Sequence, residues 1–140
     1  MVNTNKRLPP SRPHPTDAER RIADGPCHVL ATVHALIREK GYKGIHVATE
    51  DGSGEMIDYC MDEQDLADLV MSLRDRHYNG SEWCKFSPAS PWFEADSYRI
   101  RKAEKLPSER DVRQCSYYLK FSINKLGSMI LFFSVHRDKL

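Results

Sequence analysis

Residues 117–140 carry the clearest alternation of polar and apolar positions in the chain. They read YYLKFSINKLGSMILFFSVHRDKL, in which two alternating apolar runs flank a short polar turn. A period of two residues is typical of a half-buried strand. We therefore predict a C-terminal β-hairpin with residues 124–127 as its loop. The side chains of the first strand expected to face a core are Cys115, Tyr117, Leu119, Phe121 and Ile123. In the second strand, one face is expected to carry Met129, Leu131, Phe133 and Val135.

Two other segments repeat apolar residues at helical spacing. The first helix is predicted to end at Gly41, and the second is predicted from about Asp62 to Tyr78, before Asn79 and Gly80. A shorter helix is predicted after Thr16, because Glu19 completes a capping-box pattern. The apolar stripes are Val29, Leu30, Val33, Leu36 and Ile37 in the first helix and Leu66, Leu69, Val70 and Leu73 in the second.

The rest of the chain reads as short strands and connections. We predict strands at residues 44–49, 55–60 and 83–87, extended chain at 97–101, a turn at 51–54, and loops at 87–91 and 102–113. Helices that come early and strands that come late predict an α+β fold, an antiparallel sheet with two main helices packed on one face. Residues 1–15, which contain four prolines, are expected to form a flexible arm before a single domain of residues 16–140.

Charge is unevenly distributed, although the formal net charge is only +1. Residues 45–73 contain no Lys or Arg and several carboxylates, whereas bases outnumber acids in residues 97–125. Two interpretations stay open. Either these are two solvated faces of opposite sign, or the basic half meets a polyanion while the acidic half stays away from it.

Metal, cofactor and membrane signals are weak in the sequence. The four cysteines are widely spread, and no pair has the spacing of a zinc knuckle. The histidines share no regular spacing with carboxylates. No signal peptide or membrane-length apolar run stands out. We therefore expect a reduced cytoplasmic protein with buried free thiols, no bound metal and no cofactor.

The predicted hairpin carries side chains suited to a phosphodiester. Tyr118 and Lys120 are two residues apart in a strand and therefore share a face. The second strand ends in His136 and Arg137, of which only one can point toward Tyr118; the parity of Ser134 favours His136. Histidine is the natural acid or base at neutral pH, and arginine binds phosphate oxygens.

Several collinear segments resemble the MqsR family of bacterial toxins. They are residues 26–41 (PCHVLATVHALIREKG), residues 69–73 (LVMSL) followed by Lys85 in WCKFS, residues 92–99 (WFEADSYR), and residues 118–123 (YLKFSI) with 131–135 (LFFSV). The resemblance covers residues 26–140. It implies a RelE-like fold and a metal-independent endoribonuclease that cleaves messenger RNA, with a short GCU-like preference, and that a cognate antitoxin neutralises.

The resemblance also implies candidate site residues. Tyr118 matches the family's catalytic Tyr, and Lys85 matches the Lys that follows the second helix. The family's C-terminal Lys falls at His136 or Arg137. Its catalytic Gln has no clean counterpart, because Glu94 and Ala95 compete for that place. The complete candidate set is Lys85, Tyr118, His136, Arg137 and Glu94 for catalysis, with Tyr98, Arg99 and Lys120 for RNA binding by stacking and phosphate contact.

Each candidate also has an ordinary structural interpretation. Lys85, Lys120 and His136 can be solvated surface residues, Tyr118 can close a sheet edge, and Glu94 reads best as a surface carboxylate. Two other functions therefore stay open. One is a non-catalytic RNA- or protein-binding module on the same fold. The other is an unrelated small α+β protein whose acidic helix from Asp62 contacts a partner.

Overall fold

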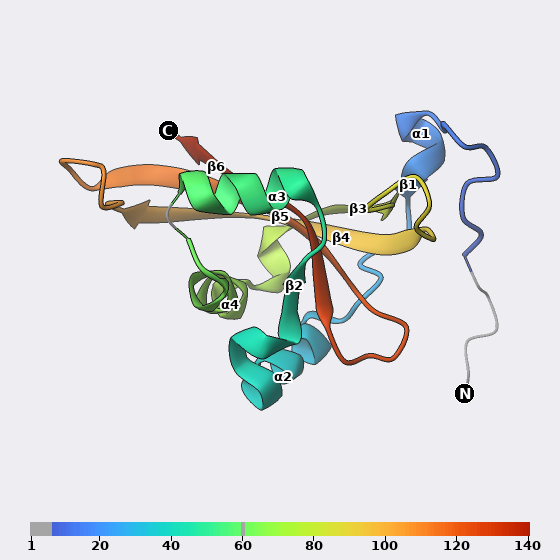
Figure 1. Ribbon diagram of the computed structural model, residues 1–140, viewed down its shortest axis with the longest axis horizontal. Coiled ribbons are helices and arrows are strands. Elements are labelled where there is room, and N and C mark those ends of the chain that lie inside the picture. Colours follow the sequence, from blue (N-terminus) through green and yellow to red (C-terminus); the bar gives the residue numbers. More distant parts are fainter. Residues whose placement is uncertain (1–6, 60) are drawn as a thin grey trace.

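The computed structural model describes residues 7–59 and 61–140, and a six-stranded sheet runs through this part of the chain (Figure 1). The strand order is β1-β3-β4-β5-β6-β2. Neighbouring strands are antiparallel except that β2 runs parallel to β6. The predicted antiparallel sheet is therefore corrected to a mixed one at this edge. The strands are β1 (Arg21–Ile22), β2 (Ile45–Val47), β3 (Tyr78–Cys84), β4 (Phe93–Glu104), β5 (Arg113–Ile123) and β6 (Ile130–Lys139).

Helices occupy the first half of the chain, so the predicted mixture of helices and sheet is confirmed. The capping box at Thr16 and Glu19 starts α1 as expected, and Asp62 caps α4 in the same way with Asp65. The α-helices are α1 (Asp17–Arg20), α2 (Leu30–Lys40), α3 (Glu50–Asp58) and α4 (Glu63–Ser72), with 3-10 turns η1 (Gly41–Gly44) and η2 (Asp75–His77).

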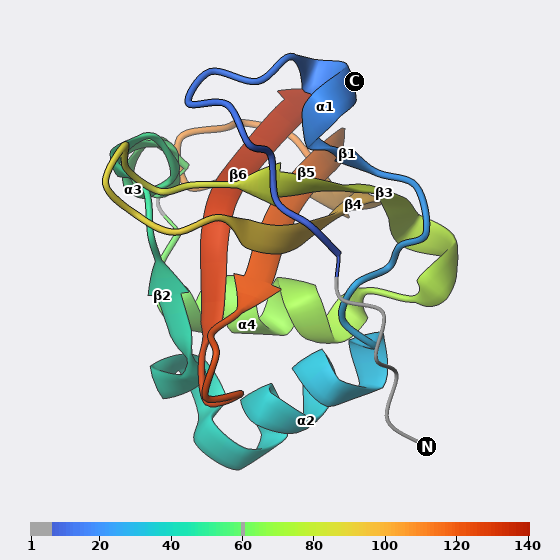
Figure 2. The ribbon, with the colours of Figure 1, turned by 90° about the vertical axis from the view of Figure 1, so that its right-hand side faces the viewer.

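The main core lies between one face of the sheet and the helices α2 and α4. Val33 of α2 and Val70 of α4 are fully buried, in one cluster with alternate residues of β4, β5 and β6. Figure 2 shows both helices on the same side of the sheet. We call this the helix-covered face and the opposite side the outer face. The sheet residues of the cluster are Tyr98, Ile100, Tyr117, Leu119, Phe121, Ile130, Phe132 and Val135.

A β-bulge in β6 corrects the predicted facing of the second hairpin strand. Lys120 pairs with Ser134, but its neighbour Phe121 pairs with Phe132, so Phe133 is an extra residue in β6. As a result Val135 joins the main core, whereas Phe133 joins a second cluster on the outer face. The residues of this second cluster are Cys84, Ala95, Leu131 and Phe133, with Phe93 and Met129 packed against them.

The turn predicted at 51–54 and the strand predicted at 55–60 are wrong, because residues 50–58 form α3. Thr49 fixes the start of this helix: its hydroxyl accepts the N–H of Gly52 and donates to the carbonyl of Phe133 in β6. A Cβ at Gly52 would lie 3.1 Å from a methyl group of Val47, so glycine permits this close approach. Tertiary contact with the sheet edge thus overrides the turn propensity of the sequence. Cys60 lies outside the described residues.

Two further boundaries differ from the predictions. The second main helix ends at Ser72 rather than Tyr78, and the residues Asn79 and Gly80 lie within β3, where Gly80 has a φ of +116° beside an irregular pairing. The loop predicted at 102–113 is confirmed for residues 105–112 and is shorter at both ends, because β4 continues to Glu104 and β5 begins at Arg113. The β4–β5 hairpin extends beyond the helices (Figure 1).

The described part of the N-terminal arm, residues 7–15, contains no helix or strand. Arg7 nevertheless attaches it to the domain, because its guanidinium lies 2.9 Å from Asp24 and 2.7 Å from Glu94. The first six residues of the predicted flexible arm lie outside the described residues.

Candidate functional site

Three side chains of the outer face stand next to one another across three adjacent strands. Tyr118 of β5 pairs with Arg99 of β4 on one side and with His136 of β6 on the other. Paired residues of neighbouring strands point to the same face, with Cβ atoms about 4.5–5.5 Å apart. The Arg99 guanidinium lies 5.0 Å from the centre of the Tyr118 ring, a cation–π contact. Of the two alternatives left open by the sequence, His136 is therefore the residue beside Tyr118.

Carboxylates flank His136 on both sides. Its Nδ1 lies 2.9 Å from Glu55 of α3, and its Nε2 lies 2.8 Å from Asp138, which is two residues further along β6. The hydrogen bond to Glu55 is the largest cause that raises the pKa of His136; burial opposes it, and Asp138 adds to it. Asp138 also lies 3.7 Å from Arg99. These contacts favour a protonated imidazole that donates from both nitrogens.

Lys120 continues the same face toward β3. Its ammonium lies 2.7 Å from the carboxylate of Glu82, which also lies 3.2 Å from Arg20. Burial lowers the pKa of Lys120, but the charge of Cys84 and the hydrogen bond and charge of Glu82 outweigh burial and raise it above its ordinary value. Tyr118 and Lys120 both line an open hollow of about 710 Å³.

These residues form what we call the Tyr118 site, which consists of Arg99, Tyr118, Lys120 and His136 with the carboxylates Glu55, Glu82 and Asp138. It combines an imidazole whose pKa is raised by its carboxylate partners, carboxylates that can accept a proton, and two cations within one sheet face. Such a set can bind a phosphodiester and move protons at it without further groups.

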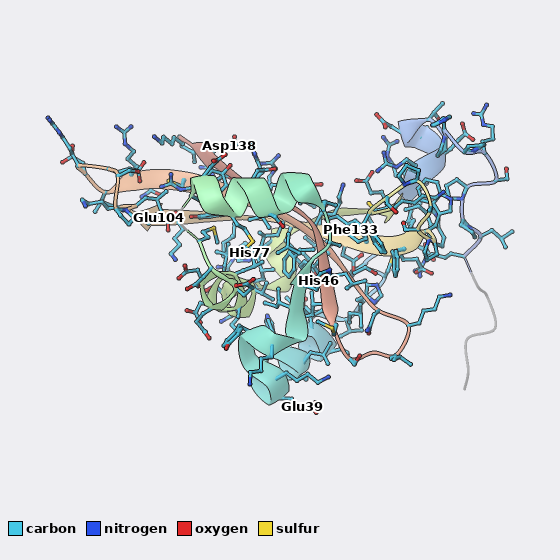
Figure 3. All side chains as sticks on the ribbon, in the orientation of Figure 1. Glu39, His46, His77, Glu104, Phe133 and Asp138 are labelled. Atoms are coloured by element: carbon cyan, nitrogen blue, oxygen red, sulfur yellow. The ribbon has the colours of Figure 1, made fainter. Side chains whose placement is uncertain are left out.

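Arg137 points the other way, into a separate buried cluster. Its guanidinium lies 2.9 Å from Glu104 and 2.9 Å from Glu109, and its side chain is only 2% exposed. The hydrogen bond from Arg137 lowers the pKa of Glu109 to about 2. Figure 3 shows Glu104 and Asp138 on opposite sides of the sheet. The candidate role of Arg137 as a phosphate clamp is therefore corrected to a structural one, because its donors face buried carboxylates.

Tyr98 was expected to line an RNA groove, and this prediction is wrong. It is 1% exposed, with its ring stacked on Phe121 at 5.4 Å between centres. Its strand neighbour Arg99 points to the outer face, since successive strand residues alternate. Tyr98 is thus a core residue.

Lys85 and Glu94 lie away from the Tyr118 site. Lys85 follows the end of β3, and its ammonium sits 4.7 Å above the centre of the Trp92 ring. Phe93, the partner of the last β3 residue, is six positions along β4 from Arg99, which is about 20 Å at the rise of a strand. Glu94 is held by Arg7. The structure therefore does not bring Lys85 or Glu94 to Tyr118.

Sequence reasoning missed three carboxylates of this site, Glu55, Glu82 and Asp138. Asp138 could have been found, because it shares strand parity with His136. Glu55 could not have been placed, because its segment was predicted as a strand and only the packing of α3 beside β6 brings it to His136. Glu82 required the pairing of β3 with β4.

The structure also shows where the cysteines and the residue types that bind metals lie. Cys84 and Cys115 are buried, and Cys27 is half-buried; all three are free thiols. Within residues 7–59 and 61–140, no three His, Cys, Asp or Glu side chains are grouped so as to hold a metal ion. In the same part of the chain, no helix has both the length and the apolar character needed to cross a membrane.

Comparison of the chain with protein-family models, with curated proteins and with solved structures found no match. The assignment of a function therefore rests on the residues and geometry of the Tyr118 site.

Proposed function

We propose that this chain is an endoribonuclease that cleaves messenger RNA at the Tyr118 site without a metal ion. The observation that supports it best is the row Arg99, Tyr118 and His136 across three paired strands, with a carboxylate on each ring nitrogen of the histidine. A cation, a phenol, an acid and a base then lie within the dimensions of one nucleotide linkage.

In the proposed reaction, Asp138 removes the proton of an RNA 2′-hydroxyl. The 2′-oxygen forms a bond to the adjacent phosphorus, and the bond from phosphorus to the 5′-oxygen breaks. Protonated His136, oriented by Glu55, gives its proton to the leaving 5′-oxygen. The products are a 2′,3′-cyclic phosphate and a 5′-hydroxyl. Arg99 stabilises the charge that develops on the phosphate oxygens.

Tyr118 and Lys120 complete the proposal. The Tyr118 hydroxyl binds and orients the phosphate. Lys120 lines the same hollow and adds positive charge once an RNA phosphate displaces Glu82 from its ammonium group. The reaction uses the 2′-hydroxyl as nucleophile, which restricts the substrate to RNA.

The resemblance to MqsR toxins adds a cellular role to this proposal. This role includes a RelE-like arrangement of the fold, growth arrest by the expressed protein and neutralisation by a cognate antitoxin. In this proposal Lys85, Glu94 and Arg137 leave the catalytic set, and Arg99, Glu55 and Asp138 enter it.

The direct experiment is incubation of the purified protein with single-stranded RNA in EDTA. We expect fragments that end in 2′,3′-cyclic phosphate, and a loss of rate of about 100-fold or more in H136A. H46A is the matched control, because His46 is an exposed histidine on the edge strand β2 and should leave the rate unchanged. Intact RNA, or fragments made equally well by H136A, would reject the proposal.

One observation favours a second function, a non-catalytic RNA- or protein-binding module. Both ring nitrogens of His136 are held by carboxylates, which compete with the transfer of its proton to an RNA oxygen. This alternative predicts RNA that is bound in a salt-dependent way but stays uncut in the same incubation.

A further inference from the structure

The far end of the outer face carries an aromatic cluster that the proposed reaction does not use. The Phe86 ring lies 5.5 Å from Phe93 and 6.5 Å from Phe133 between centres. Phe86 is 40% exposed, although it belongs to a group of packed aromatic rings. Most of a core aromatic ring would be buried, so this exposure marks a surface that is available for contact.

A wide hollow of about 1060 Å³ opens beside this cluster. Lys85 and Phe86 line it on one side, together with Pro88, while His14 lines it from the N-terminal arm. Among the described residues, its lining contains no carboxylate. The hollow therefore combines an aromatic ring with basic groups, whereas the Tyr118 site contains three carboxylates.

This combination matches the chemistry of an unpaired nucleotide. A nucleobase presents a π-face that stacks on an aromatic ring, and its phosphate attracts an ammonium group. Lys85 is held above the ring of Trp92 at 4.7 Å, so its charge is positioned at the surface close to Phe86. A base inside a duplex could not reach Phe86, because its faces are covered by its neighbours in the stack.

Strand β6 connects the aromatic cluster beside the hollow with the Tyr118 site. Phe133 of the aromatic cluster and His136 are three residues apart on this strand, about 10 Å at the rise of a strand. Stacked nucleotides of one strand advance about 3.4 Å each, so about 10 Å along β6 and about 20 Å from Phe93 to Arg99 along β4 correspond to about three to six nucleotides. One RNA strand can thus reach both places.

We propose that the hollow at Lys85 and Phe86 is a nucleobase subsite for single-stranded RNA, in which Phe86 stacks on an unpaired base and Lys85 contacts the neighbouring phosphate. The inference rests on the proposed function, since it places the substrate of the Tyr118 site, and it makes the substrate unpaired RNA rather than duplex.

The test measures binding rather than cleavage. A fluorescently labelled single-stranded 2′-O-methyl RNA, which has no free nucleophile, is titrated with the full-length protein and followed by anisotropy. We expect F86A to weaken binding about 5-fold to 100-fold, the range for loss of one stacked base, and F86W to bind like the unmodified protein. V112A is the matched control, because Val112 is an exposed apolar residue in the β4–β5 loop.

Further variants separate stacking from general apolar contact and from charge. F86L keeps an apolar side chain and should bind nearly as weakly as F86A. K85M should weaken binding and reduce the slope of log K against log salt by about 0.7. A 4-thiouridine placed in the RNA should crosslink to the peptide that contains Phe86.

Some outcomes would overturn the subsite. Binding by F86A or F86L equal to that of the unmodified protein would reject it, as would equal affinity for a duplex of the same RNA. The binding of F86A is compared with that of the unmodified protein only if its denaturation midpoint matches that of V112A. If the midpoints differ, F86W tests the same position. Cleavage in EDTA with unchanged F86A binding would reject the subsite alone, whereas F86A-sensitive binding without cleavage would reject the catalytic proposal alone.

Discussion

Asp96 is a fully buried carboxylate that connects three parts of the chain. It is 0% exposed and accepts hydrogen bonds from the backbone N–H groups of Cys27 and His28, each at 2.8 Å, and from the hydroxyl of Ser81 at 2.6 Å. These contacts attach the segment before α2 to strands β3 and β4. We predict that Asp96 is among the most important single side chains for stability.

The magnitude follows from the donors that lose their acceptor. In D96A the two part-buried backbone N–H groups of Cys27 and His28 lose their acceptor, at about 1–3 kcal/mol each. The expected loss in the free energy of unfolding is therefore about 2–6 kcal/mol. D96N keeps one acceptor oxygen and should lose about 1–3 kcal/mol, because its amide group cannot accept the second N–H. The larger loss is a substantial part of the about 5–15 kcal/mol that stabilises a typical domain.

The assay is urea denaturation of full-length protein, followed by tryptophan fluorescence and circular dichroism. D111N serves as the matched control, because Asp111 is exposed in the β4–β5 loop, and it should change the free energy by less than about 0.5 kcal/mol. The reasoning would be refuted if D96A lost less than about 1 kcal/mol, or if D96N were less stable than D96A.

Three other predictions concern charged groups. E55Q should lower the pKa of His136, as measured by NMR titration of the ring, because a neutral amide replaces the charged acceptor of the hydrogen bond that raises it most; an unchanged or higher pKa would contradict the geometry. Because the folded-state pKa is raised, the stability from this histidine is fully present below about pH 6.5 and is lost as pH rises through the folded-state value. R137M should cost up to about 3–5 kcal/mol in urea denaturation, since it removes the buried partner of Glu104 and Glu109 and leaves them only the exposed cations Lys102, Arg113 and Lys139; a near-neutral change would show that these cations compensate. The double variant K105A and R110A, in the exposed loop of the β4–β5 hairpin, should reduce the salt slope of RNA binding by about 1.4 if each side chain contacts one phosphate, and an unchanged slope would exclude that contact.

Local patterns in the sequence were sufficient for much of the secondary structure. The capping box at Thr16 predicted α1, the apolar stripe ending at Gly41 predicted α2, and the alternation in residues 115–123 predicted β5. These elements could be predicted because each depends on neighbours within a few residues. The mixture of helices and sheet followed from them.

Other elements were decided by contacts between distant segments. Residues 50–58 contain two glycines and read as a turn, yet they form α3 where Thr49 is bonded to the Phe133 carbonyl. The bulge at Phe133 separates Val135, which lies in the main core, from Leu131 and Phe133, with which it was predicted to share a face. Neither the helix nor the bulge can be predicted from the residues around it, because the partner that stabilises each of them is on another strand.

For the candidate site, the sequence by itself determined which chemistry was available on the hairpin: Tyr118 and Lys120 on one face, with His136 favoured by parity. Only the tertiary structure decided the rest. It placed Arg99 and Glu55 beside this pair of strands, turned Arg137 toward buried carboxylates, and left Lys85 with the aromatic cluster. The physical reason is that periodicity along a chain specifies which side of an element is buried, whereas strand register and helix packing specify which side chains meet.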